Sequence, residues 1–150
     1  MIDTTVVLNA GSSSLKFSLF TEGAAKSTGS LELLASGRVA AAWLDSLEPG
    51  ALSSLRHWHL NEDEFVMVLS GELVMIEDEG ETLLRPGDCA THKAGVANGH
   101  HLVNRASANA SFLVVGTRAA TDRAHYPDVD MLALKDEGGS RFVHRDGSPY

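Results

Sequence analysis

Turns that contain glycine recur at short and even intervals through the middle of this chain. They are Ser70-Gly71, Glu79-Gly80, Pro86-Gly87 and Ala94-Gly95. The runs between them are short, and they are either apolar or alternate between apolar and polar residues. Turn signals at this spacing are typical of antiparallel sheets that close into a sandwich or a barrel. The sequence therefore predicts an all-β fold.

Residues 56–71 (RHWHLNEDEFVMVLSG) contain two histidines two positions apart and a carboxylate five residues later. Because alternate residues of a strand point to the same face, His57 and His59 can converge on one point while Trp58 faces away. The polar residues 60–63 predict a turn, and Glu64 opens an apolar run that predicts the returning strand. This hairpin would bring Glu64 beside the two imidazoles. Such a ligand set suits a divalent zinc, iron, manganese or nickel ion.

The same residues resemble the first motif of the cupin superfamily, H-x-H-x4-E-x6-G preceded by Pro-Gly. The second cupin motif is matched by the turn at residues 86–88, the turn at residues 94–95, and His100 standing before Asn104. Together the motifs cover about residues 47–115. The resemblance implies an antiparallel double-stranded β-helix, the jelly-roll barrel of cupins. It also implies one divalent metal, with His57, His59, Glu64 and His100 as ligands.

The loop before the last of these ligands is two residues longer than the form that cupins often have. The fourth ligand could therefore be His100 or His101, which lie on opposite faces if this stretch is a strand. His100 keeps the spacing to Asn104 and is preferred, so His101 is expected to face outward or to pack. His92, after the Pro-Gly-Asp turn, could face the cavity, but we expect a surface histidine.

The N-terminal residues 6–20 (VVLNAGSSSLKFSLF) resemble the opening of acetate and propionate kinases. The resemblance places Asn9, Ser12, Ser14 and Lys16 at a phosphoryl-transfer site. Nothing after about residue 40 resembles those kinases, so we expect no kinase activity from this segment. From the residues alone we expect a β-hairpin with strands at residues 5–9 and 14–20.

Three regions follow from these patterns. Residues 1–40 form the kinase-like segment, residues 41–118 the barrel, and residues 119–150 a tail. The tail has few regular apolar repeats, and we expect it to pack on the barrel or on a partner subunit. The alternative is a lid over the barrel mouth, where Arg118, Arg123 or Arg141 could meet an anionic ligand.

The charge of the chain limits which classes of partner it can bind. The net charge is -8 and the pI is about 5.2, which argues against nucleic acid or an anionic membrane as a partner. No signal peptide is evident and no apolar run approaches the roughly 20 residues of a membrane span, so we expect a cytoplasmic protein. The apolar run at residues 65–69 does not alternate cleanly, so its outer face needs a cover. We expect a homodimer to supply it, with the N-terminal hairpin as the rival cover.

The expected function is that of a small cupin that acts on a small polar, carboxylate-bearing or sugar-like molecule. The reaction could be an isomerisation, a lyase reaction or a dioxygenation. The alternative is a module that binds a small ligand or a metal without catalysis, because one fold hosts many functions. The sequence nominates no general base. A titratable residue that is not a ligand but points into the cavity would favour the enzyme.

Overall fold

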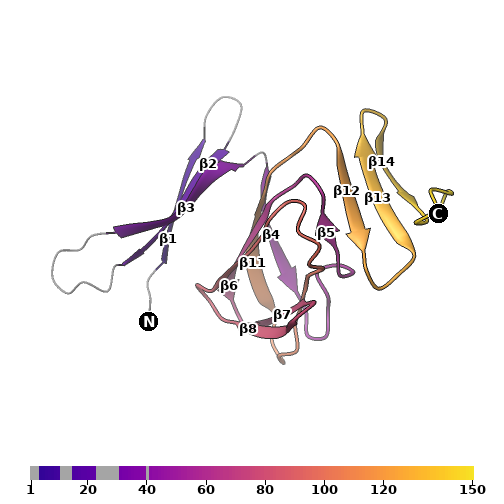
Figure 1. The fold of residues 1–150 in the computed structure, drawn as a ribbon. Helices are drawn as coiled ribbons and strands as arrows, with labels where there is room; N and C mark the ends of the chain where they lie inside the picture. The colour runs from indigo at the N-terminus through magenta and orange to yellow at the C-terminus, as the bar shows by residue number, and fades with distance from the viewer. Residues whose placement is uncertain (1–3, 11–14, 23–30, 40) are drawn as a thin grey trace.

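The computed structural model describes residues 4–10, 15–22, 31–39 and 41–150, and within them every regular element is a strand. This confirms the all-β prediction. Figure 1 shows a central barrel with one sheet on each side of it, the first built from the N-terminal strands and the second from the C-terminal strands. All the strand pairs are antiparallel.

Two sheets form the barrel. One has the order β4 (Ala41–Leu47), β11 (Ala110–Gly116), β6 (Glu64–Ser70) and β9 (Cys89–His92). The other has the order β10 (His101–Val103), β7 (Leu73–Glu77) and β8 (Gly80–Leu84). The barrel strands are short because glycine turns interrupt them, as the sequence predicted. Gly71, between β6 and β7, has a φ of +73° that favours glycine.

The core of the barrel lies between its two sheets. It is a cluster of buried apolar side chains from most of the barrel strands: Leu47, Val66, Val68, Leu73, Met75, Leu84, Leu102, Ala110, Phe112 and Val114. Burying a side chain of this size stabilises the fold by roughly 1.5–3 kcal/mol. Val66 and Val68 alternate along β6, so Glu64 at the start of that strand shares their inward face. The periodicity that builds the core therefore also aims a carboxylate into the barrel.

Asn104 fixes the turn that follows β10. Its side chain is fully buried, and its Nδ2 donates to the carbonyl oxygens of Leu47 (2.8 Å) and Ala108 (2.9 Å). Its Oδ1 accepts from the backbone nitrogen of Ala106 at 3.0 Å. An amide with two donors and an acceptor suits this position, because all three groups find backbone partners. The asparagine of the second motif is therefore a structural residue that holds the strand beside His100.

The C-terminal sheet has the order β14 (Gly139–Val143), β13 (Met131–Asp136), β12 (Asp122–Tyr126) and β5 (Trp58–His59). The tail is thus a meander of three strands that pairs with the histidine segment. The sequence did not predict these strands because their burial pattern is weak, with most residues of β13 half-buried. A strand with neither face fully buried gives little alternation to read.

The N-terminal sheet has the order β1 (Thr4–Ala10), β2 (Leu15–Glu22) and β3 (Leu31–Val39). The predicted hairpin is present, with Asn9 paired to Lys16, and β3 adds a strand that was not predicted. Ser12 and Ser14 lie outside the described residues. Phe65 on β6 is 3% exposed within a single chain, so that position needs no second copy to cover it. The homodimer stays a prediction.

Candidate metal centre

The two motifs are joined through their backbones at the site. His57 donates its backbone nitrogen to the carbonyl of His100 (3.2 Å), and His100 donates its own to the carbonyl of His57 (2.9 Å). On the other side, β5 pairs with β12, with His59 opposite Ala124. Trp58 alternates with the two histidines and stacks on His125, with ring centroids 4.2 Å apart. The histidine segment is therefore held between the barrel and the C-terminal sheet.

Three predicted ligand histidines are fixed through the same ring atom. The Nδ1 of His57 lies 2.8 Å from the carbonyl oxygen of Leu55, and that of His100 lies 3.2 Å from the carbonyl oxygen of Asn98. The Nδ1 of His59 lies 2.5 Å from Oδ2 of Asp122. A carbonyl or carboxylate oxygen only accepts, so each Nδ1 donates. The lone pair of each neutral ring is thereby left on Nε2, as a metal ligand requires.

The four predicted ligands fall into two overlapping groups. His57, His59 and Glu64 offer ligand atoms that all lie within 4.8 Å of one another. His100 joins Glu64 in a second such group, and its Nε2 lies 3.5 Å from Oε1 of Glu64. Among the described residues His101 belongs to neither group, so the geometry favours His100 over His101 as a ligand.

The donor set fits a divalent cation. The Nε2 of His100 is buried, and it has no hydrogen-bond partner. Leaving such an atom unsatisfied costs roughly 1–3 kcal/mol, which a metal bond would offset. Burial lowers the pKa of His57. Burial alone would raise the pKa of Glu64, but the nearby rings of His100, His57 and His59 outweigh it and lower that pKa. Neutral imidazole and ionised carboxylate are the states that bind metal.

Asp122 contacts a predicted ligand, and the sequence did not reveal this contact. Its side chain is 5% exposed, and it accepts from Nδ1 of His59 and from the backbone nitrogen of Asn61 at 2.9 Å. Burial raises its pKa, but these hydrogen bonds outweigh burial and hold the pKa below its usual range. Tyr126, also on β12, stacks on His57. The tail therefore contacts two of the predicted ligands, and it gives no local motif that could have predicted this.

Contrary to the prediction, His92 is not a surface histidine. Its side chain is 9% exposed and its ring stacks on that of His100, with centroids 3.3 Å apart and planes 6° apart. The physical reason is strand register: His92 is paired with Glu64, and directly opposed residues point to the same side of a sheet. Burial, as the largest cause, lowers the pKa of His92 to about 4, so this ring is also neutral. Knowing how β6 and β9 pair would have placed His92 beside Glu64, but this pairing cannot be read from the sequence alone.

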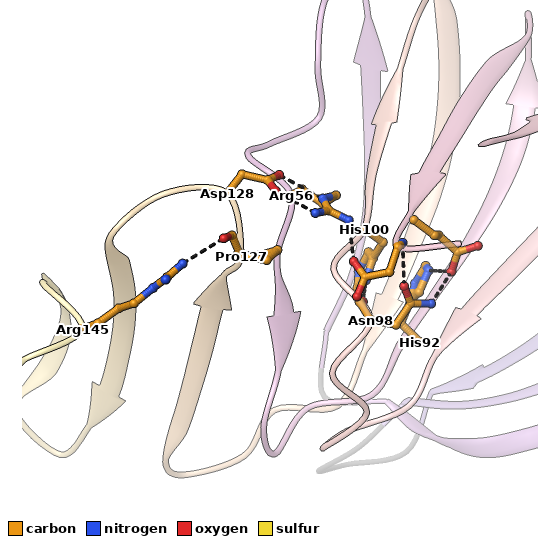
Figure 2. Close-up of polar contacts among 9 residues, drawn as sticks. Arg56, His92, Asn98, His100, Pro127, Asp128 and Arg145 are labelled. Atoms are coloured by element: carbon orange, nitrogen blue, oxygen red, sulfur yellow. Dashed lines mark hydrogen bonds and ion pairs between the residues drawn. The ribbon is translucent and has the colours of Figure 1, made fainter. Parts of the chain in front are cut away.

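A polar network supports the site from outside, as Figure 2 shows. Arg56, directly before His57, binds both carboxylate oxygens of Asp128 at 2.9 and 2.6 Å and also contacts Asp78. Asn98 donates to Oε1 of Glu77 at 2.9 Å, and its carbonyl accepts from His100. These contacts connect the ligand segments to the turns after β7 and β12.

The ligand groups lie in the wall of a cavity of about 310 Å³. Beyond the ligands its lining includes the titratable residues Asp45, Glu62, Asp63, His101 and Arg118. His101 was expected to face outward or to pack, and it lines this cavity with its Nδ1 3.0 Å from the carbonyl oxygen of Ser54. A second cavity of about 170 Å³ shares His59, Glu62, Glu64 and His100 with the first. The proposed ligands thus separate two cavities.

Comparison with known proteins identifies the family. The model of the cupin domain family matches residues 43–116. A sugar phosphate isomerase of the cupin superfamily from Silicibacter pomeroyi DSS-3 is 43% identical over 90% of this chain and 80% of its own, with a TM-score of 0.71. The chain belongs to the cupin superfamily. A second solved structure, described as a putative sugar phosphate isomerase from Acidithiobacillus ferrooxidans ATCC 23270, is 27% identical over 73% of this chain and 69% of its own, with a TM-score of 0.66.

A search of curated proteins finds no match to this cupin. Within the part of the chain that the structure describes, none of the elements is a helix that could span a membrane. Histidine and glutamate groups in the cupin barrel can hold a divalent metal. The likeness of the N-terminal segment to acetate and propionate kinases stays a prediction.

Proposed function

We propose that this cupin is a metal-dependent isomerase that acts on a small phosphorylated sugar. The observation that carries the proposal is the set of histidines fixed at Nδ1 beside Glu64, in the wall of a cavity of about 310 Å³. A cavity of this volume is at the small end of ligand sites. The sugar phosphate isomerase that is 43% identical supports the substrate class.

Arg118 is the residue that we assign to the phosphoryl group. It follows β11, and it is the one arginine or lysine among the described residues that line the larger cavity. The described structure gives its side chain no ion-pair partner, whereas Arg56, Arg105 and Arg141 each bind a carboxylate. A guanidinium group can bind two phosphate oxygens at once.

His101 is the residue that we assign to proton transfer. Its Nδ1 donates to the carbonyl oxygen of Ser54, so the lone pair of the neutral ring is on Nε2 and can accept a proton. Aldose–ketose isomerisation moves a proton from a hydroxyl-bearing carbon to the neighbouring carbonyl carbon, while a hydroxyl proton moves to the carbonyl oxygen. A titratable wall residue that is not a ligand favours the enzyme over the binding module.

A metal held by His57, His59, Glu64 and His100 would polarise the substrate hydroxyl and carbonyl. The protein itself contributes the fixed orientation of the ligands. Asp122 and the carbonyls of Leu55 and Asn98 keep each imidazole in place before the substrate arrives. This reduces the reorganisation that must accompany the reaction.

The test is an isomerase assay with the metal varied. Apoprotein is loaded separately with Zn²⁺, Fe²⁺, Mn²⁺ or Ni²⁺ and incubated in D₂O with aldose and ketose phosphates, and proton NMR follows both interconversion and loss of the carbon-bound proton. We expect turnover with at least one metal, which EDTA abolishes and His57→Ala lacks. Arg118→Ala should raise KM for the phosphorylated substrate, while Arg123→Ala, at an exposed arginine outside the cavity lining, should not. Binding of sugar phosphates without proton exchange under any metal would overturn the proposal in favour of a binding module.

A further inference from the structure

His92 remains unexplained by a centre with a single ion. Both of its ring nitrogens are buried and neither has a hydrogen-bond partner. A neutral imidazole always has one N–H to donate and one lone pair to fill. Two unmatched atoms of this kind on one ring are costly to bury. The ring is also close to carboxylates, since its Nε2 lies 3.5 Å from Oε1 of Glu77 and it shares a ligand group with Glu64.

The geometry does not place His92 and His100 on one ion. An imidazole binds a metal in the plane of its ring, and these two planes are 6° from parallel with the centroids 3.3 Å apart. Planes stacked in this way do not meet at a common point. Each ring nevertheless brings a nitrogen within 4.8 Å of the Glu64 carboxylate. Two ions lying side by side satisfy both observations, and metals in two-metal sites are about 3.5–4 Å apart.

We propose that His92 binds a second divalent cation beside the first, with Glu64 bridging the two ions and Glu77 as a further ligand. The inference rests on the first metal position of the proposed function, but not on the isomerase reaction. The smaller cavity, which His92 and Glu64 both line, gives the second ion its own approach. Carboxylates that lie around the two positions would offset the added charge: Glu62, Glu64, Glu77 and Asp122.

The test is the number of Mn²⁺ ions per chain and their magnetic coupling. Equilibrium dialysis of the full-length apoprotein should give two ions per wild-type chain, with the EPR signal of a spin-coupled pair. His92→Phe keeps an aromatic ring against His100 but has no nitrogen, so it should bind one ion with an uncoupled six-line signal. His125→Phe is the matched control, because it replaces a stacked histidine outside every ligand group, and it should behave as wild type.

Glu77→Gln tests the proposal without changing His92, in case His92→Phe does not fold. It should weaken the second ion at least tenfold and leave the first unchanged. A wild-type protein that saturates at one Mn²⁺, or a pair of uncoupled ions in wild type, would overturn the proposal. So would a coupled pair retained in His92→Phe. The ion count and the isomerase assay test different proposals. A protein that binds one ion could still catalyse the isomerisation, and a protein without isomerase activity could still bind two ions.

Discussion

Asp122→Asn should weaken metal binding although residue 122 is not proposed as a ligand. The carboxylate uses its two oxygens on two donors, Nδ1 of His59 and the backbone nitrogen of Asn61. An amide has one oxygen, so one of the donors must face an NH₂ group instead. Loss of the partner that orients a metal-binding histidine typically costs 10–100-fold in affinity. We therefore expect the metal Kd to rise 10–100-fold, equivalent to about 1.4–2.7 kcal/mol.

The assay is competition with a chromophoric chelator, in parallel with thermal unfolding of the apoprotein. The donor left without an acceptor is buried, so the unfolding free energy of the apoprotein should fall by about 1–3 kcal/mol. Asp130→Asn is a matched control. Asp130 also pairs with a histidine, His144 at 3.0 Å, but this pair is exposed and belongs to none of the ligand groups. The reasoning fails if Asp122→Asn binds metal within about twofold of wild type, or if Asp130→Asn weakens binding as much.

Further predictions follow from other parts of the chain. Gly71→Ala should destabilise the fold by about 1–3 kcal/mol, because its φ is +73° and a Cβ would lie 2.7 Å from that of Ala110. Gly50 has a similar φ but open space around it, so Gly50→Ala should lower the free energy of unfolding by less. A denaturant titration of both variants checks this. Burial raises the pKa of Cys89 to about 11, so alkylation by iodoacetamide should accelerate about tenfold per pH unit from pH 8 to 10. At pH 8 it should be roughly a hundredfold slower than for an unperturbed thiol with a pKa of 9.0. A level rate above pH 9 would contradict this. Deleting residues 1–20 should leave the metal content of the protein unchanged. The full chain should show no turnover in a coupled assay with acetate and ATP, and kinase activity that Asn9→Ala abolishes would refute this. Sedimentation equilibrium should show a homodimer at micromolar concentration, and a monomer would reject it.

The parts of the site that could be predicted are those with local signals. His57 and His59 are two residues apart, and Glu64 begins a run whose alternation continues through Val66 and Val68 into the core. These relations depend on the period of a strand and need no knowledge of its neighbours. The glycine turns likewise carry their own conformational requirement. For these reasons the all-β fold and the first ligand group follow from a short stretch of chain.

The parts that were missed depend on pairing between distant segments. His92 is at the site because β9 pairs with β6 in one register, and Asp122 is there because β12 pairs with β5. His92 would move to the opposite face with a shift of one residue. Asp122 is 63 positions from the histidine that it orients, and nothing near it in the sequence distinguishes it from other acidic residues. Register and long-range pairing are properties of the assembled sheet.

The pairing of β5 with β12 also has a consequence for how the protein is made. On the ribosome, His57, His59 and Glu64 emerge well before the residues that hold them. Asp122 and Asp128 follow much later, and Lys135, which binds Glu62 at 2.6 Å, later still. A nascent chain therefore exposes metal-binding side chains without the contacts that orient them. Selective metal loading must wait until β12 has emerged and paired with β5.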